Sequence, residues 1–434
     1  MKKSPYILLN LADQNINKSV TIRGWISNIR SSGKIAFLQI RDGIGVIQAV
    51  VVKSEVKPQV YDHIRSLTLE SSIELTGTIK QEPRSPTGFD LQVTNLKPIH
   101  VAPDDYPIGK KEHGPAFLLD NRHLWLRSPK QRAIQIIRHH IIAAIFDFYK
   151  SHNFIKIDTP IITPNACEGT TTLFELDYFG TPTYLSQSGQ LYLEAAIFSV
   201  GRCFDFSPVF RAEKSKTRRH LTEFWMTNAE SSFVEHDQNL EIQENMIMFI
   251  LKKVLKNCQE EFNTLNRDIT PLEKIKAPFK RLTYHQVIKQ LNKLGSDIKI
   301  GEDLGNDDES ILMNHYTQPI FIEHWPANIK AFYMKRLPQD NSLALCADLL
   351  APEGRGEIIG GSQREDDYDT LLASIKSHKL PQDEFGWYLD LRKYGSVPHS
   401  GFGLGLERLV GWIANLEHVR ETTPFPRLLN RYKP

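Results

Sequence analysis

Residues 204–230 carry side chains suited to hold a nucleotide. Arg211 and Glu213 lie on one face of a predicted strand, a basic loop follows at 214–220, and Phe224 lies on the return strand. Arginine can bind phosphate through two parallel hydrogen bonds, which lysine cannot do. A phenylalanine ring can stack on a purine. A solvated charged hairpin is the commoner explanation for a charge run, but the phenylalanine at matching parity favours a nucleotide site.

Two carboxylates further along the chain could hold a divalent cation. Asp348 and Glu357 flank a glycine-bearing stretch near residues 354–364. Mg²⁺ prefers a few carboxylates together with phosphate oxygens over a cage made only of protein ligands. Paired acids are common on protein surfaces, so this pattern alone is weak support for a metal site.

Glycine alternates along one predicted strand, with Gly401, Gly403 and Gly405 on the same face. A face without side chains lets a flat ligand lie directly on the backbone. Arg408 follows at the junction with a predicted helix at 409–416, where it can pack over a base and neutralise a phosphate. The spacing differs from the GxGxxG of dinucleotide-binding folds, and no βαβ pattern surrounds it.

The elements that must position these groups fall into two regions. Short strands separated by turns fill the N-terminal hundred residues and suit a closed barrel of the OB-fold kind. A helix at 130–151 and an extended piece ending in Pro160 follow, and the later strands occur in adjacent runs, which favours an antiparallel α+β sheet flanked by helices. We therefore predict an OB-fold barrel at 1–100, a linker at 101–128, and an α+β domain at 129–434 with an inserted segment at about 235–330.

Side-chain parity places a candidate RNA-binding face on the barrel. In the predicted strand 35–41 the even positions are apolar and should point inward, so Phe37 faces outward. Gln48 faces outward from the next strand, and Arg30 lies nearby in the sequence. An aromatic ring, an amide and a guanidinium suit an unstacked base and its phosphate. Phe37 could instead fill a small satellite core under a loop, and the strand pattern leaves both explanations open.

Bulk properties limit the class of protein. The 434 residues have a formal net charge of +2, so contacts with nucleic acid must come from local basic patches. The four cysteines are scattered without metal-ligand spacing, which argues against structural zinc and against a disulfide framework. The N-terminal stretch lacks a signal-peptide core, and no apolar run is long enough to span a bilayer. We expect a soluble cytoplasmic protein without a membrane anchor.

Three segments in order resemble the signature motifs of the class II aminoacyl-tRNA synthetases. Residues 210–213 (Phe-Arg-Ala-Glu) and 219–224 (Arg-His-Leu-Thr-Glu-Phe) resemble motif 2, and residues 403–408 (Gly-Leu-Gly-Leu-Glu-Arg) resemble motif 3. The helix and strand ending in Pro160 resemble motif 1, which implies a homodimer through that region. The resemblance covers nearly the whole chain, and the N-terminal barrel matches the aspartyl, asparaginyl and lysyl subgroup.

The resemblance implies a role for each nucleotide-binding residue. Arg211 would bind the α-phosphate of ATP, and Glu213 would contact the adenine edge. Phe224 and Arg408 would sandwich the adenine ring, and His220 would help to hold the γ-phosphate. Such chemistry relies on positioning and electrostatics and needs no protein nucleophile.

The resemblance also implies the magnesium and anticodon contacts. Asp348 and Glu357 would carry Mg²⁺ on the polyphosphate, so Glu357 joins Arg211 and Arg408 among the catalytic candidates. Phe37 and Gln48 match a pair that stacks on and reads the central anticodon base, and Arg30 is a looser match.

One residue indicates the asparaginyl branch of the subgroup. Aspartyl enzymes carry a lysine that pairs with the substrate carboxylate, and Leu193 stands at that position within residues 188–194. Because a carboxamide needs no second cation, the resemblance implies asparagine and tRNA(Asn) as the substrates that are joined with the energy of ATP.

The remaining pocket residues follow from the same resemblance. Arg364 would donate to the side-chain carbonyl of asparagine. Glu168 and Gln190, with Ser188 beside them, resemble the groups that hold the α-ammonium.

One position departs from the asparaginyl pattern. Such enzymes usually carry two glutamates where this chain has Asn228 and Glu230, and the first glutamate accepts a hydrogen bond from the substrate amide. Asn228 could accept through its carbonyl oxygen, but without charge assistance. An aspartyl or altered-substrate paralogue and a non-catalytic RNA-binding relative are the alternatives. The presence of the motif 2 and motif 3 residues speaks against the last.

Overall fold

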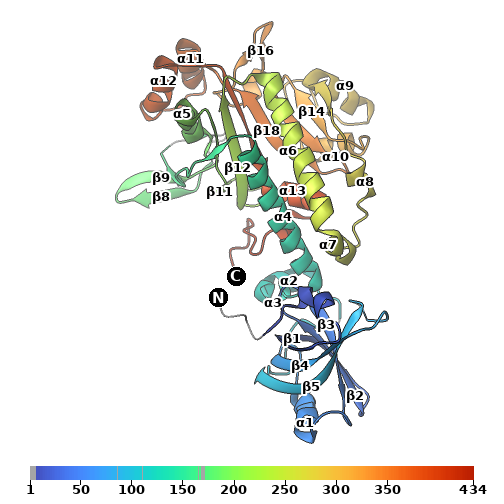
Figure 1. Ribbon diagram of the computed structural model, residues 1–434. Helices are drawn as coiled ribbons and strands as arrows, with labels where there is room; N and C mark the ends of the chain where they lie inside the picture. The colour runs from blue at the N-terminus through green and yellow to red at the C-terminus, as the bar shows by residue number, and fades with distance from the viewer. Residues whose placement is uncertain (1–5, 86, 110, 165, 168–171) are drawn as a thin grey trace. The chain divides into compact units, whose positions relative to one another are not determined.

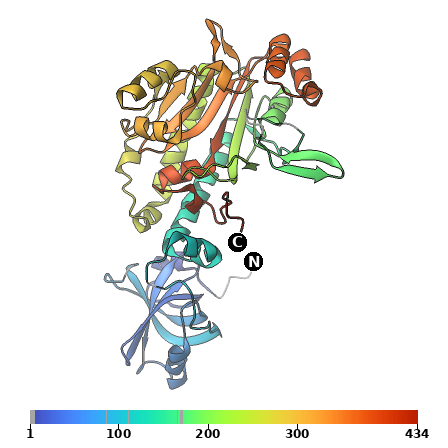
Figure 2. The ribbon, with the colours of Figure 1, turned by 180° about the vertical axis from the view of Figure 1, so that it is seen from behind.

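The computed structural model describes residues 6–85, 87–109, 111–164, 166–167 and 172–434. The chain divides into two units, residues 1–114 and 115–434 (Figures 1 and 2). Two short helices open the second unit, α2 (Pro115–Asp120) and α3 (Arg122–Trp125). In the described part of the chain, no helix is both long enough and apolar enough to cross a membrane.

The first unit is a closed five-stranded barrel, which confirms the predicted OB-fold. Its strands follow the order β1-β2-β3-β5-β4, and only the β3–β5 pair is parallel. Alternating residues fill the barrel, since Ala36, Leu38 and Ile40 are fully buried while Phe37 faces outward. The elements are β1 (Ser19–Ser31), β2 (Ile35–Arg41), β3 (Val46–Val52), α1 (Pro58–Ser66), β4 (Ser72–Gln81) and β5 (Phe89–His100).

The second unit is built on a nine-stranded sheet in the order β13-β14-β17-β18-β19-β12-β10-β6, with β11 paired to β12. The central pairs are antiparallel, as the sequence predicts, and one parallel pair lies at each edge. The strands are β6 (Ile155–Lys156), β10 (Arg202–Phe204), β11 (Ser207–Phe210), β12 (Glu223–Ser232), β13 (Lys280–Thr283), β14 (Ile320–Glu323), β17 (Cys346–Ala351), β18 (Gly356–Gln363) and β19 (His399–Gly405).

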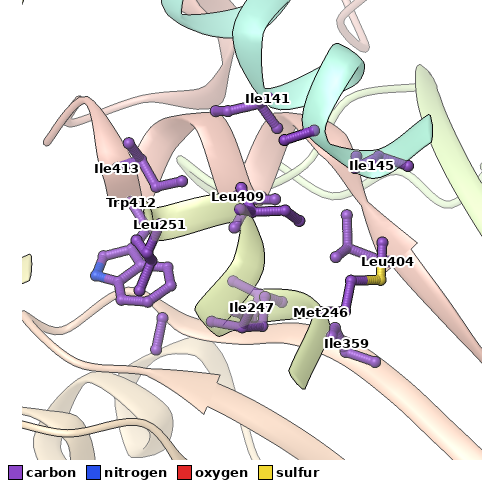
Figure 3. Packing of buried hydrophobic residues seen from close by; sticks show 14 of the residues in the cluster. Ile141, Ile145, Met246, Ile247, Leu251, Ile359, Leu404, Leu409, Trp412 and Ile413 are labelled. Atoms are coloured by element: carbon purple, nitrogen blue, oxygen red, sulfur yellow. The ribbon is translucent and has the colours of Figure 1, made fainter. Parts of the chain in front are cut away.

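Three helices cover one face of this sheet: α4 (Pro129–Ser151), α6 (His236–Asn257) and α13 (Leu406–Ile413). Figure 3 shows Ile141 and Ile145 of α4 and Met246 and Ile247 of α6 packed with Leu404 of the sheet. Burying each such side chain contributes about 1.5–3 kcal/mol. Since the apolar residues of the sheet point to the helices, the alternate residues face the other side.

Helix α4 begins as its sequence predicts. Ser128 precedes it, and the serine Oγ accepts a hydrogen bond from the amide of Gln131, while Pro129 occupies the first turn. Four isoleucines at helical spacing, Ile134, Ile137, Ile141 and Ile145, are fully buried, which confirms the predicted helix.

Smaller elements surround the sheet. The segment predicted as an insertion contains α6, the edge strand β13 and its neighbour β14, together with α7 (Gln259–Thr264), α8 (Thr270–Glu273), α9 (Tyr284–Lys293) and α10 (Asn306–Met313). The other elements are α5 (Gln190–Val200), α11 (Tyr368–Ser377), α12 (Gly386–Lys393), a three-stranded sheet of β7 (Ile162–Thr163), β8 (Glu175–Tyr178) and β9 (Thr181–Leu185), and a hairpin of β15 (Arg336–Leu337) and β16 (Asp340–Ala344).

Candidate active site

A cavity of ≈ 440 Å³ lies on the sheet face opposite the helices. Its walls come from β12, β18 and β19, where Gly360, Gly403 and Gly405 line it while their neighbours Ile359 and Leu404 belong to the helix-covered core. Of the three glycines predicted to form an open face, Gly403 and Gly405 line the cavity, whereas Gly401 lies against Glu230. Most predicted site residues line it together: Ser188, Gln190, Arg211, Glu213, His220, Phe224, Asn228, Asp348, Glu357, Arg364 and Arg408.

The nucleotide-binding candidates gather on the motif 2 hairpin. The Arg211 guanidinium carbon lies 5.5 Å from the centroid of the Phe224 ring, and Nη1 of Arg211 donates to the carbonyl of Gln187. Burial lowers the pKa of His220, and Arg408 lowers it further, so the imidazole is neutral at pH 7. An arginine beside an accessible phenyl ring can hold phosphate and base together.

The two predicted metal-binding carboxylates lie on the same face, each beside a cation. Arg408 Nη1 donates to Glu357 Oε2 at 2.8 Å, and Lys330 Nζ donates to Asp348 Oδ2 at 2.9 Å. Burial raises the pKa of Asp348 to about 7. Burial also acts to raise the pKa of Glu357, but Arg408 and Lys330 outweigh it and hold that pKa below its ordinary value. Since both carboxylates line the cavity, the pair offers oxygen ligands to a cation bound there.

Asn228 is held in one orientation by a buried acid. Its side-chain Nδ2 donates to Asp205 Oδ1 at 2.9 Å, and its backbone amide donates to the same oxygen at 3.0 Å. The Ser188 hydroxyl donates to Asn228 Oδ1 at 3.1 Å. Since Ser188 and Asn228 both line the cavity, the arrangement presents the Asn228 carbonyl oxygen, and not its NH₂ group, toward the site.

Glu230 lies directly behind the cavity, where it binds Arg364. Nε of Arg364 donates to Glu230 Oε2 at 3.2 Å, and Nη2 donates to Oε1. Burial and the neighbouring Glu194 raise the pKa of Glu230, against the pull of Arg364. Arg364 lines the cavity, whereas Glu230 fixes its guanidinium from behind.

A second buried carboxylate, Glu194 of α5, supports the same wall. Oε2 of Glu194 accepts hydrogen bonds from Tyr388 and Arg392, each at 2.6 Å, and lies 3.1 Å from Nε2 of His399. Gln190, which lines the cavity, donates to Oε1 of Glu194 at 3.0 Å. Arginine and histidine partners hold the pKa of Glu194 well below its ordinary value even though burial alone would raise it.

Two glycines make room for the buried acids. A Cβ on Gly401 would lie 2.0 Å from Oε1 of Glu230, and a Cβ on Gly189 would lie 1.9 Å from Oδ2 of Asp205. Such separations are far inside van der Waals contact, so any side chain at either glycine would displace a carboxylate.

Comparison with known proteins assigns the family. The sequence matches the family model of the class II tRNA synthetases (D, K and N) over residues 114–429, and the model of the OB-fold nucleic acid binding domain over residues 20–99. The chain is 52% identical over 427 residues to the asparagine–tRNA ligase of Desulforamulus reducens, covering 98% of this chain and 99% of the relative. This chain belongs to the asparagine–tRNA ligases.

Solved asparaginyl-tRNA synthetases have the same architecture. The enzyme of Pyrococcus horikoshii complexed with asparaginyl-adenylate is 40% identical, with a TM-score of 0.96 over 100% of both chains. The Entamoeba histolytica enzyme is 34% identical, with a TM-score of 0.90 over 96% of this chain and 97% of that chain. Family membership as a class II synthetase implies the use of ATP.

The residues predicted to bind the anticodon lie together on the barrel of this asparagine–tRNA ligase. Arg30 of β1 pairs with Phe37 of β2, and Gln39 of β2 pairs with Gln48 of β3. Phe37 faces away from the barrel core, so the satellite-core alternative does not describe its position. Nε2 of Gln48 donates to Asp90 at 3.2 Å, which orients the amide.

Sequence reasoning missed the residues that hold the site from behind. Lys330, Asp205 and Glu194 were assigned no role, although each contacts a predicted site residue. A charged residue within an apolar pattern was the available signal, as for Asp205 between Phe204 and Phe206. Glu168 lies outside the described residues. Leu193 is buried beside Ile197 and Cys203 in a small apolar cluster.

Proposed function

We infer that the protein activates asparagine with ATP and transfers it to tRNA(Asn). The observation that carries this inference is a single cavity lined both by the motif 2 and motif 3 arginines and by the polar side chains of Asn228 and Arg364. The chain is also 52% identical to an asparagine–tRNA ligase. In the first step the asparagine carboxylate attacks the α-phosphorus, an acyl–phosphate bond forms, and pyrophosphate leaves. In the second a ribose hydroxyl of tRNA attacks the acyl carbon, and AMP leaves.

The nucleotide-binding roles follow from charge and shape. Arg211 stabilises the negative charge that develops on the α-phosphate during attack. Phe224 and Arg408 hold the adenine between a ring and a guanidinium, and Glu213 contacts the adenine edge. His220 donates to the γ-phosphate from a neutral imidazole.

Asp348 and Glu357 are the residues that would hold Mg²⁺. A Cβ on Gly360 would lie 3.1 Å from Glu357 Oε1 and 3.5 Å from Asp348 Oδ1, so both carboxylates reach one spot above the glycine. Two carboxylate ligands with phosphate oxygens suit this cation. When bound there, it neutralises charge on the polyphosphate. Lys330 positions Asp348 by donating to its other oxygen.

The amino-acid pocket matches a carboxamide. Arg364, fixed by Glu230, donates to the side-chain carbonyl of asparagine, and Asn228 Oδ1 accepts from its NH₂ group. Gln190 and Ser188 would hold the α-ammonium, and the resemblance assigns the same role to Glu168, which lies outside the described residues. Turning the Asn228 amide over would place its carbonyl oxygen against the Asp205 carboxylate. The side-chain carboxylate of a bound aspartate would therefore face the Asn228 carbonyl oxygen, which cannot donate a hydrogen bond to it.

Exchange of pyrophosphate into ATP tests this pocket. The wild-type protein should catalyse exchange with asparagine but not with aspartate; equal exchange with aspartate would refute the assignment. Asn228→Asp keeps the shape of the side chain but sets two carboxylates together, so kcat/KM for asparagine should fall about 10- to 100-fold, because a hydrogen bond to a charged group contributes about 1.5–3 kcal/mol.

A double variant supplies the matched control for this prediction. In Asp205→Asn combined with Asn228→Asp, the amide and the acid trade places and the hydrogen bond can form again. Part of the lost exchange activity should return. No recovery in a well-folded double variant would show that Asp205 does not orient position 228.

The barrel face would read the anticodon, with Phe37 stacking on a base, Gln48 reading an edge and Arg30 holding phosphate. Phe37→Ala should lower kcat/KM for charging tRNA(Asn) by about 5- to 150-fold, because stacking on one base contributes about 1–3 kcal/mol. Pyrophosphate exchange without tRNA should not change. Phe37→Tyr keeps the ring and serves as the control, so an equal loss in both variants would count against stacking.

A second copy of the chain is proposed as a partner through the motif 1 region. Ile155, Ile161 and Ile162 flank Pro160 and are each at least 40% exposed, and β6 is an edge strand of the sheet. An exposed apolar patch of this kind is typical of a subunit interface. Sedimentation should give a dimer mass, and Ile161→Glu should shift the protein toward the monomer; a monomeric wild type would exclude the proposal.

A further inference from the structure

Metal-binding side chains cluster away from the catalytic cavity. His236, Glu323 and His324 each offer one ligand atom, and the three atoms lie within 4.8 Å of one another. His236 is the first residue of α6, and Glu323 is the last residue of β14. None of the three lines the cavity described above.

The sheet separates this cluster from the catalytic carboxylates. Ile322 of β14 pairs directly with Asp348 of β17, so these two side chains share the cavity face. Glu323 alternates with Ile322 and lies on the same face as Phe321, which is buried in the helix-covered core. The cluster is therefore a second site on the other side of the sheet.

The geometry is close to that of a bound transition metal. Nε2 of His236 lies 3.2 Å from Oε2 of Glu323. Nitrogen and oxygen ligands 2.0–2.2 Å from a tetrahedral zinc ion lie about 3.3–3.5 Å apart, so this pair already has the required separation. His324 adopts a left-handed backbone with φ of 58°, and its ring centroid lies 5.6 Å from that of His236. A side-chain rotation would complete the triad.

The surroundings leave these ligands available. His236 is only 7% exposed. Its Nε2 contacts Glu323, and its other ring nitrogen, Nδ1, has no hydrogen-bond partner among the described residues. Buried polar atoms are rarely left unpaired without a reason. The nearby Asp237 pairs with Arg281 at 2.6 Å.

We propose that His236, Glu323 and His324 bind one divalent transition-metal ion, with Zn²⁺ as the expected occupant. Two imidazoles and a carboxylate suit zinc and leave a fourth position for water. The ion would connect the start of α6 to the end of β14. The ligands on these two elements, His236 and Glu323, are 87 positions apart in the sequence.

Titration with Zn²⁺ in excess Mg²⁺ tests the proposal. The excess Mg²⁺ should keep Zn²⁺ from the proposed magnesium ligands Asp348 and Glu357, while the imidazole ligands of the second site favour zinc. The full-length protein should bind one equivalent of Zn²⁺ by calorimetry. His324→Ala and Glu323→Gln should each weaken that binding by at least about 10- to 100-fold, because even the loss of a group that only supports a ligand has this effect. His315→Ala, which removes an exposed histidine elsewhere, should bind as the wild type does.

A thermal measurement complements the titration. Zn²⁺ should raise the Tm of the wild type and of His315→Ala, and should leave the Tm of His324→Ala unchanged. Retained asparagine-dependent exchange in His324→Ala and Glu323→Gln shows that these variants fold. Absence of zinc binding by the wild type, or equal binding by all the variants, overturns the proposal.

Discussion

Arg211→Ala is expected to lose about 10²- to 10³-fold in the rate of asparagine-dependent pyrophosphate exchange. Removing one preorganised donor from a developing oxyanion costs an enzyme about this much. Arg211 is partly exposed and donates to the backbone carbonyls of Gln187 and Phe210, so the substitution should not unfold the protein. Steady-state exchange at saturating asparagine, with the Tm as a check on folding, measures the effect.

Two further variants separate charge from geometry at this position. Arg211→Lys keeps the positive charge but loses the planar fork, so its activity should lie between that of the wild type and that of Arg211→Ala. Lys252→Ala removes an exposed cation from α6, outside the cavity, and should leave exchange unchanged. A loss of less than tenfold in Arg211→Ala would remove this residue from the catalytic set.

Glu194→Gln is expected to lower the stability of the second unit by about 3–5 kcal/mol. The glutamine keeps the shape of the side chain but leaves the fully buried Arg392 without its counter-charge, and breaking one side of a buried ion pair costs this much. The loss corresponds to a Tm lowered by roughly 5–15 °C. Thermal unfolding followed by circular dichroism measures it.

An exposed acid on α6 supplies the control. Glu241→Gln removes the same charge from the surface and should change stability by no more than about 0.5 kcal/mol. The pH dependence gives an independent check. Because folding lowers the pKa of Glu194 below 4.5, its contribution is present above that pH and disappears as the pH falls. The wild type and Glu194→Gln should therefore converge in stability in acid, and parallel curves would contradict the role.

Local pattern was sufficient to predict the barrel and the cavity wall. Alternation along residues 35–41 set which side of β2 is buried, and the glycines of β19 set which side of the sheet is open. These features depend on neighbours in sequence. Arg211 follows β11, Phe224 lies on β12, and Arg408 lies in the first turn of α13 after β19. These residues meet in one cavity because β11 and β19 both pair with β12.

The supports of the site could not be predicted in the same way. Lys330 reaches Asp348, and Glu194 reaches Arg392, through contacts between elements far apart in the chain. The orientation of the Asn228 amide depends on its hydrogen bond to Asp205. These two residues are 23 positions apart, and no sequence pattern predicts that they are in contact. The position of Glu230 behind the pocket, bound to Arg364, likewise depends on packing and not on a local pattern.

The two glycine–carboxylate contacts constrain how this sequence can diverge. The carboxylate of Glu230 occupies the space that a side chain at position 401 would need, and the carboxylate of Asp205 does the same for position 189. A substitution at either glycine therefore displaces a carboxylate unless the acid has already been replaced. A lineage can leave this arrangement only by first shortening or removing the acid and then enlarging the glycine. In an alignment of homologues, we expect a side chain at position 401 or 189 only where the matching acid has already been replaced by a smaller residue.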